Sequence, residues 1–287
     1  PAADRAAFLS KSDLATGMVT EFTELQGEMG KEYALLDGEK PEVAKAIFEQ
    51  YMPRFAGDIL PQQEISRALS LADKLDNLAA TFLRGLIPTG SQDPFALRRQ
   101  TIGAVNILTD GKIHWDIRRG IEAALALLPG DEETKKTVLS QIEDFFRQRI
   151  KAIMLDEGIA YDIIDAVLAG PVDDIYALFL KARSMAESQL KDEAELRQAV
   201  TRLANITKGK TGGKVDPSLF TEDVEKKLQD AFEAVSAKAL PLFASYEYGK
   251  ALPALKELTA PINDYLDNVM VMVDDEAVKN NRISQLL

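Results

Sequence analysis

The chain has 287 residues, of which 46% are apolar and 28% charged, with no cysteine and a single histidine, His114. This length provides for one or two domains with a sizeable core. Without cysteine, the chain forms no disulfide, Cys-ligated zinc site or thiol nucleophile. One imidazole excludes a metal centre that needs two histidines from this chain. The net charge of −12 argues against a surface that attracts nucleic acid everywhere, but it allows a local basic face.

No apolar run approaches the roughly 20 residues that span a membrane. The first five residues lack the basic and then apolar regions of a signal peptide. The sequence begins without Met and ends on apolar residues. We therefore expect a cytoplasmic protein, of which this chain is one piece.

Apolar residues recur at three- and four-residue steps along most of the chain, which is typical of amphipathic helices. The predicted helices include 71–78, 113–128, 138–153, 175–185, 196–206, 224–235 and 262–273. The piece 269–273 taken alone resembles a strand, but it continues the apolar stripe that begins at Ile262, so we predict helix there. No series of alternating strands is evident, and the predicted class is all-α.

Two breaks interrupt the helical pattern. Residues 85–94 contain two Gly and two Pro and are the best linker candidate, and residues 207–217 form a second glycine-rich break. We predict a helical unit at 1–84, a linker at 85–94 and a larger helical bundle at 95–287.

Asp73 and Asp76 lie on a predicted helix whose leucines face inward. An aspartate in this setting resembles the last metal ligand of HD-domain phosphohydrolases, in which it joins several histidines. Because no histidine precedes His114, we expect no catalytic metal and no phosphoester hydrolysis here. A solvated or helix-capping role is favoured for both aspartates, which are at most vestigial remains of an HD-like fold.

Residues 196–215 contain five basic residues and no acidic one. The stretch from Lys208 to Lys214 superficially resembles a phosphate-binding loop. However, that motif lies between a strand and a helix and ends in Lys-Ser/Thr, whereas Lys214 is followed by Val215. We expect a basic loop whose ammonium groups meet a phosphate backbone. A merely solvated loop is the alternative.

Several blocks in order along the chain resemble the β subunit of bacterial-type, heterotetrameric glycyl-tRNA synthetase. They include FLSKSDLATGMV at 8–19 and DPFALRR at 93–99, and the others lie at 24–30, 53–58, 72–76, 161–167, 202–206, 269–275 and 281–282. The resemblance covers essentially the whole chain.

The resemblance implies that an α subunit activates glycine with ATP and Mg²⁺, while β binds tRNA(Gly) and completes an α2β2 enzyme. Residues 1–84 would end an HD-like helical domain. Residues 95–287 would form an anticodon-binding domain similar to that of arginyl-tRNA synthetase, truncated at its C-terminal end. We therefore expect no catalytic residue, metal or cofactor in this chain itself, and neither a membrane nor DNA as its partner.

The predicted tRNA contacts are Arg98, Arg99, Arg202, Lys208, Lys210 and Lys214. Arginine would act by planar hydrogen bonding or stacking, and lysine by attraction to phosphate. For Arg98 and Arg99, surface salt bridges are the competing interpretation. Two other functions were weighed: a helical scaffold that binds only protein, and an independent HD-type phosphohydrolase, against which the missing histidines argue.

Overall fold

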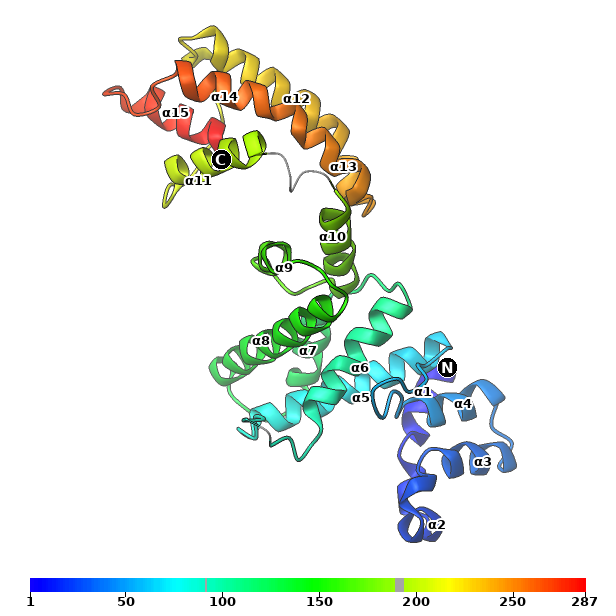
Figure 1. Ribbon diagram of the computed structural model, residues 1–287. Coiled ribbons are helices and arrows are strands. Elements are labelled where there is room, and N and C mark those ends of the chain that lie inside the picture. The colour runs from blue at the N-terminus through cyan, green and yellow to red at the C-terminus, as the bar shows by residue number, and fades with distance from the viewer. Residues whose placement is uncertain (91, 189–193) are drawn as a thin grey trace. The chain divides into compact units, whose positions relative to one another are not determined.

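The computed structural model describes residues 1–90, 92–188 and 194–287. The regular secondary structure within these ranges consists of helices joined by loops. Across them no strand forms, and the only β-type pairings are isolated bridges. The all-α prediction is confirmed. The chain divides into two compact units, unit 1 from Pro1 to Phe179 and unit 2 from Leu180 to Leu287 (Figure 1).

Unit 1 is built around one long central helix. Its helices are α1 (Ala2–Leu9), α2 (Gly17–Glu21), α3 (Glu28–Leu36), α4 (Pro41–Glu49), α5 (Glu64–Leu83), α6 (Leu97–Asp110), α7 (Ile117–Ala126), α8 (Glu132–Asp156) and α9 (Tyr161–Leu168), with short 3-10 turns at Ser12–Ala15 and Thr23–Leu25. Helix α5 contacts α1, α4, α6, α7 and α8. Its Leu71, Leu75 and Leu78 are buried, as the periodicity predicts.

A capped start and an apolar face position α8 in unit 1. The carboxylate of Asp131 accepts a hydrogen bond from the backbone N–H of Thr134 at 2.8 Å and another from the Thr134 hydroxyl at 2.7 Å. Such an N-cap contributes about 1 kcal/mol. Further along, Phe145 packs edge-on against Phe82 of α5, with ring centroids 5.2 Å apart.

Unit 2 contains a second core. Helix α10 (Ile175–Glu187) crosses the division between the units, and the rest is α11 (Ala194–Thr207), α12 (Asp223–Ala244), α13 (Tyr248–Leu255), α14 (Thr259–Asn268) and α15 (Glu276–Leu286), with 3-10 turns at Pro217–Leu219 and Lys256–Leu258. Helices α12 and α14 lie side by side (Figure 1). Tyr265 of α14 is fully buried in a cluster with Leu228 and Ile283.

The prediction of helix at 269–273 is wrong, because α14 ends at Asn268. Val269 has extended backbone angles, φ −110° and ψ 121°. Val269 and Val271 are buried, while Met270 and Met272 are 74% and 57% exposed. Burial of every second residue is typical of extended chain, whose side chains alternate between faces, but here the backbone also bends at Val271 and Met272. The apolar residues at 269–273 therefore fit the helical spacing of the stripe that begins at Ile262 without being helical.

The boundary between the two compact units lies outside the predicted linker, and the predicted domain limits stay a prediction. Residues 85–94 connect α5 to α6 within unit 1, Ser91 lying outside the described residues, and the boundary between the units falls at 179/180. The assignment of HD-like and anticodon-binding roles to parts of the chain stays a prediction. The second break is confirmed, because α11 ends at Thr207 and helical structure resumes at Pro217.

None of the helices within the described ranges is long and apolar enough to cross a membrane. The cytoplasmic location expected from the sequence stays a prediction.

Candidate functional site

The basic loop, residues 208–216 of unit 2, presents three lysines that form no ion pair with a carboxylate in the described part of the chain. After the hydrogen bonds from Ser218, the charge of Lys214 also helps to lower the pKa of Asp216 at the end of the loop. Lys208 and Lys214 are exposed, and among the described residues neither makes a hydrogen bond or ion pair. The Lys210 Nζ atom lies 3.2 Å from the Met272 sulfur. Gly209 has a φ of +71°, a backbone conformation that side chains disfavour. The loop therefore carries two exposed ammonium groups, those of Lys208 and Lys214, and a half-buried one, that of Lys210.

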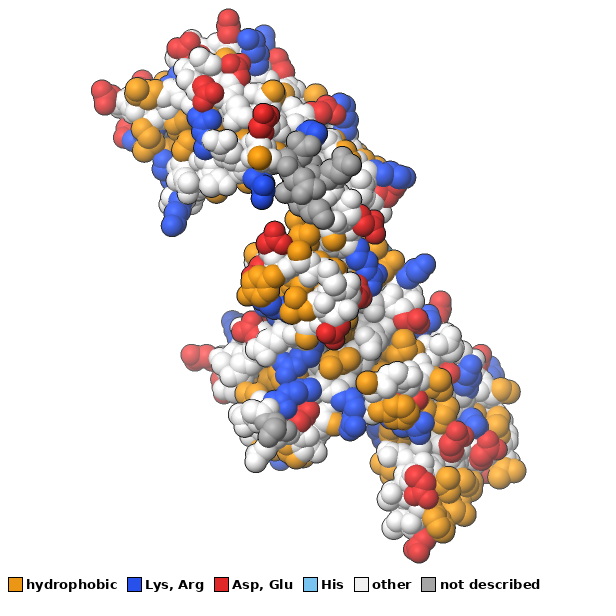
Figure 2. Space-filling model, in the orientation of Figure 1, with side chains coloured by type: hydrophobic (Ala, Val, Ile, Leu, Met, Phe, Trp, Pro, Cys, Tyr) orange, Lys and Arg blue, Asp and Glu red, His pale blue; other side chains and the backbone are white. Residues whose placement is uncertain are grey.

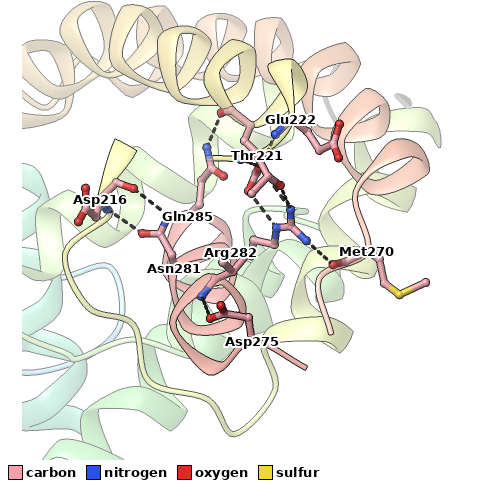
Figure 3. Close-up of polar contacts among 10 residues, drawn as sticks. Asp216, Thr221, Glu222, Met270, Asp275, Asn281, Arg282 and Gln285 are labelled. Carbon is pink, nitrogen blue, oxygen red and sulfur yellow. Dashed lines mark hydrogen bonds and ion pairs between the residues drawn. The ribbon is translucent and has the colours of Figure 1, made fainter. Parts of the chain in front are cut away.

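Helix α15 holds the second half of this loop. The Gly213 N–H donates to the Ser284 hydroxyl at 2.9 Å. The Asn281 side chain pairs with the backbone of Asp216 in both directions, accepting from its N–H at 2.7 Å and donating to its carbonyl at 3.0 Å (Figure 3). The loop is thus anchored at its C-terminal end.

A buried ion pair locks α15 against the start of α12 (Figure 3). Arg282 is 5% exposed and Glu225 is fully buried. The Arg282 Nε atom donates to Glu225 at 2.9 Å, while its two terminal nitrogens donate to the Met270 carbonyl at 2.8 Å and the Thr221 hydroxyl at 2.7 Å. The Arg282 guanidinium therefore joins α15 to α12, to the segment before α12 and to the segment after α14.

The second carboxylate oxygen of Glu225 caps α12. It accepts hydrogen bonds from the backbone N–H groups of Thr221 at 2.8 Å and Glu222 at 2.9 Å. Burial alone would raise the pKa of Glu225. The hydrogen bonds from Arg282 and the two backbone groups outweigh it, and the pKa lies below its usual range. Asn281 and Arg282, one of the sequence blocks that resemble the synthetase family, therefore have a structural role in supporting the basic loop.

The predicted contact Arg202 is engaged inside unit 2. It donates to Asp267 at 2.7 Å and lies 3.5 Å from the Asn263 side-chain oxygen, which links α11 to α14. Its charge is partly neutralised by this pair. Arg197, on the same helix, is exposed without such a partner among the described residues, although it was not singled out from the sequence.

The other two predicted contacts lie in unit 1. Arg98 donates from its guanidinium to the Gly90 carbonyl at 2.7 Å, and its backbone N–H is capped by Asp93 at 2.9 Å. Arg99 is exposed and makes no hydrogen bond or ion pair within the described part of the chain. Arg98 and Arg99 therefore belong to a different unit from the basic loop, and their role as contacts stays a prediction.

Arg99 lines what we term the α5–α6 cleft, a hollow of about 670 Å³ in unit 1. Its charged lining residues are Lys11, Glu24, Arg54, Asp73, Lys74 and Arg99. Asp73, predicted from the sequence, forms an ion pair with Lys11 at 2.8 Å. Asp76 is exposed and lines a second, apolar groove that Asp73 also borders. The two aspartates thus share that groove, but only Asp73 lines the α5–α6 cleft.

Lys74 lies buried at the floor of the cleft. Its ammonium donates to the Met52 carbonyl at 2.8 Å, the Ser70 hydroxyl at 2.7 Å and, at a longer 3.4 Å, the Gln50 carbonyl. Burial lowers the pKa of Lys74 to about 8. Gly103 of α6 packs on its stem, since a Cβ there would lie 3.0 Å from the Lys74 Cε atom.

Sequence reasoning missed this lysine and its neighbour Lys11. A signal did exist for Lys74, because its spacing from Leu71 and Leu78 places it on the buried face of α5. Among the described residues, no group of three or more His, Asp or Glu side chains is arranged to hold a metal ion. The expectation of a chain without a metal or cofactor stays a prediction.

Residues 1–169 match the family model described as glycyl-tRNA synthetase beta subunit. The chain is 46% identical over 283 residues to the glycine–tRNA ligase beta subunit of Clostridioides difficile, covering 98% of this chain and 41% of that protein. It is 42% identical over 288 residues to the beta subunit from Aeromonas hydrophila, covering 99% of this chain and 42% of the relative.

Because the family model matches more than half of its residues, the chain belongs to the glycyl-tRNA synthetase beta subunit family. It spans about two fifths of the length of these relatives.

Proposed function

We propose that this chain is the tRNA-binding, anticodon-recognising part of a glycine–tRNA ligase β subunit. In an α2β2 enzyme it supports the ATP-dependent glycylation of tRNA(Gly) by the α subunit. The observation that carries the proposal is the basic loop of unit 2, where Lys208, Lys210 and Lys214 make no ion pair with a carboxylate among the described residues.

The chemistry of the loop suits an anticodon arm. Ammonium groups on flexible stems attract phosphates without requiring one geometry. Anticodon bases are unpaired, so a protein reads them by stacking and by hydrogen bonds to their edges. The chain carries a net charge of −12, which confines the attraction to a local face. Arg98 and Arg99 would supply further contacts from unit 1.

On this proposal the chemistry belongs to the α subunit, which uses ATP and Mg²⁺, while this chain contributes no catalytic residue or cofactor. We expect the 287-residue chain alone to show no glycine-dependent ATP–pyrophosphate exchange. Exchange activity that survives removal of every trace of α subunit would contradict this division of labour.

Filter binding of tRNA(Gly) across a salt series tests the loop. Replacing Lys208, Lys210 and Lys214 by Glu should weaken binding at least about tenfold at ~0.1 M salt, and lower the log–log salt slope by up to about three units. The matched control reverses three exposed lysines elsewhere in unit 2, Lys226, Lys227 and Lys250. It should change affinity by less than about threefold.

An equal loss in the control would show that only net charge matters and would remove the loop from the interface. One observation favours the alternative of a scaffold that binds only protein: Phe8, Leu36 and Leu127 are 78%, 82% and 85% exposed on unit 1. Absence of tRNA binding by the unaltered chain would favour that alternative.

A further inference from the structure

The α5–α6 cleft gathers more positive than negative charge. Four cationic side chains line it, against two carboxylates. Lys11 and Asp73 form an ion pair and cancel one another. Asp58, outside the cleft, accepts hydrogen bonds from the Arg54 backbone N–H at 2.8 Å and from its Nε atom at 3.3 Å. The terminal nitrogens of Arg54 make no hydrogen bond within the described residues. Arg99 has no such partner among the described residues. The cleft is therefore suited to an anion.

Aromatic rings and amides border the same charges. Phe55 and Phe95 line the cleft and are 56% and 47% exposed, although rings of this size usually contribute to a core. The Asn77 amide donates to the Gln100 side-chain oxygen at 3.1 Å, and the Gln100 amide donates to the Phe95 carbonyl at 3.0 Å. These hydrogen bonds fix the orientations of the Asn77 and Gln100 amides and tie the Gln100 amide to the backbone of Phe95.

The positive charge extends beyond the cleft. A neighbouring hollow of about 430 Å³ shares Phe55 and Arg99 with it and adds both Arg98 and Asp93. Burial, and then the charge of Arg98, lower the pKa of Arg149, which indicates that the two guanidiniums lie near one another. On the face of unit 1 visible in Figure 2, basic and hydrophobic side chains lie next to each other.

Exposed aromatic faces beside guanidiniums that retain free donor nitrogens match one kind of ligand. Bases of every type stack on aromatic side chains, and phosphates pair with arginine. A hollow of about 670 Å³ lies within the usual size range of small-molecule sites. We propose that the α5–α6 cleft binds a nucleotide, with its phosphate at Arg99 and Arg54 and its base against Phe55 and Phe95.

The nucleotide has two possible sources, a free mononucleotide or an unpaired nucleotide of an RNA strand. The proposal does not depend on the basic loop, which belongs to unit 2. It also requires no catalysis, since the cleft lacks the histidines of a metal-dependent phosphohydrolase.

Isothermal titration of the 287-residue chain with four probes tests the site: AMP, adenosine, inorganic phosphate and the single-stranded tetranucleotide A4. We expect AMP or A4 to bind at least tenfold more tightly than both adenosine and phosphate. Binding by AMP assigns the site to free nucleotides, whereas binding by A4 alone assigns it to RNA. Failure of both AMP and A4 to bind overturns the proposal, as does adenosine or phosphate binding equally well.

Two pairs of variants locate the ligand. R99E should weaken binding at least tenfold, whereas R84E, which makes the same charge change at an exposed arginine outside the cleft, should stay within twofold. F55A should weaken base-dependent binding about fivefold or more. Its control is F232A in unit 2, at a ring with a nearly equal exposed fraction of 55%. Equal losses in a variant and its control would place the ligand elsewhere.

Discussion

The α5–α6 cleft of unit 1 and the basic loop of unit 2 both present positive charge on an acidic chain, but they hold it in different ways. In the cleft, Lys74 is fixed by three oxygen atoms and Lys11 by Asp73. In the loop, Lys208 and Lys214 extend without such partners among the described residues, and only the backbone beneath them is anchored.

The difference teaches which kind of ligand each region suits. Beside the fixed Lys74 and Lys11, the cleft offers oriented amides, aromatic rings and the guanidiniums of Arg54 and Arg99. This arrangement suits a ligand of one defined shape, because the ordered groups lose little side-chain entropy on binding. Lysines on an anchored but open loop suit a polymer whose phosphates can be met in several positions. The two proposals above follow this division.

The largest effect should come from removing the support of the loop. Arg282→Ala leaves Glu225 buried without its partner, which should destabilise unit 2 by about 3–5 kcal/mol. Urea unfolding followed by far-UV circular dichroism reports both units. Fluorescence of Trp115, the single tryptophan, reports unit 1. We expect an early unfolding phase in the dichroism and an unchanged midpoint in the fluorescence.

The control for Arg282 is Lys279→Ala on the same helix, which loses only a surface ion pair with Glu276 and should cost less than about 1 kcal/mol. The stability that the Arg282–Glu225 pair contributes should also depend on pH. Because the pKa of Glu225 is lowered by folding, its stabilisation is present above the unfolded-state pKa and is lost as the pH falls through the folded one. Arg282→Ala with no early phase would mean that the pair is dispensable.

A smaller expected effect is the pH dependence of unit 1 stability that the buried ammonium of Lys74 produces. The pKa of Lys74 is about 8 in the folded chain, below its ordinary value of 10.5. Below pH 8 both states hold the proton, and the cost of burying the charge is fully present. Above it, the unfolded chain binds more protons, so the stability of unit 1 should rise with pH, by about 2 kcal/mol up to pH ~9.5 and by about 3 kcal/mol in total beyond the unfolded value of 10.5.

Lys74→Met should abolish this rise, as measured by urea unfolding through Trp115 fluorescence between about pH 7 and 9.5. That window stays below the titration of Tyr51, whose pKa burial raises to about 12. Besides burial, the charges that influence Lys74 are those of Asp73 and Lys11. Parallel pH profiles for the variant and the parent chain would contradict the proposed burial of this charge.

Local pattern predicted the helical class, the inward leucines of α5 and the position of the basic loop, because each depends on neighbouring residues. It could not predict the Arg282–Glu225 pair, whose members are 57 residues apart. It gave the wrong structure for 269–273, where the helical period and the extended period favour overlapping sets of residues. It also placed Arg98 and Arg99 in the same predicted bundle as the loop, whereas the compact units separate them.

The glycine at position 103 has a consequence for how this chain could change during evolution. A Cβ at 103 would lie 3.0 Å from the Lys74 Cε atom and 3.2 Å from Pro53. A larger residue at 103 would therefore be accommodated most easily after position 74 had already become shorter, while the reverse order passes through a crowded intermediate. The two positions, on different helices, are therefore coupled, although Pro53 would still limit the size of a side chain at 103.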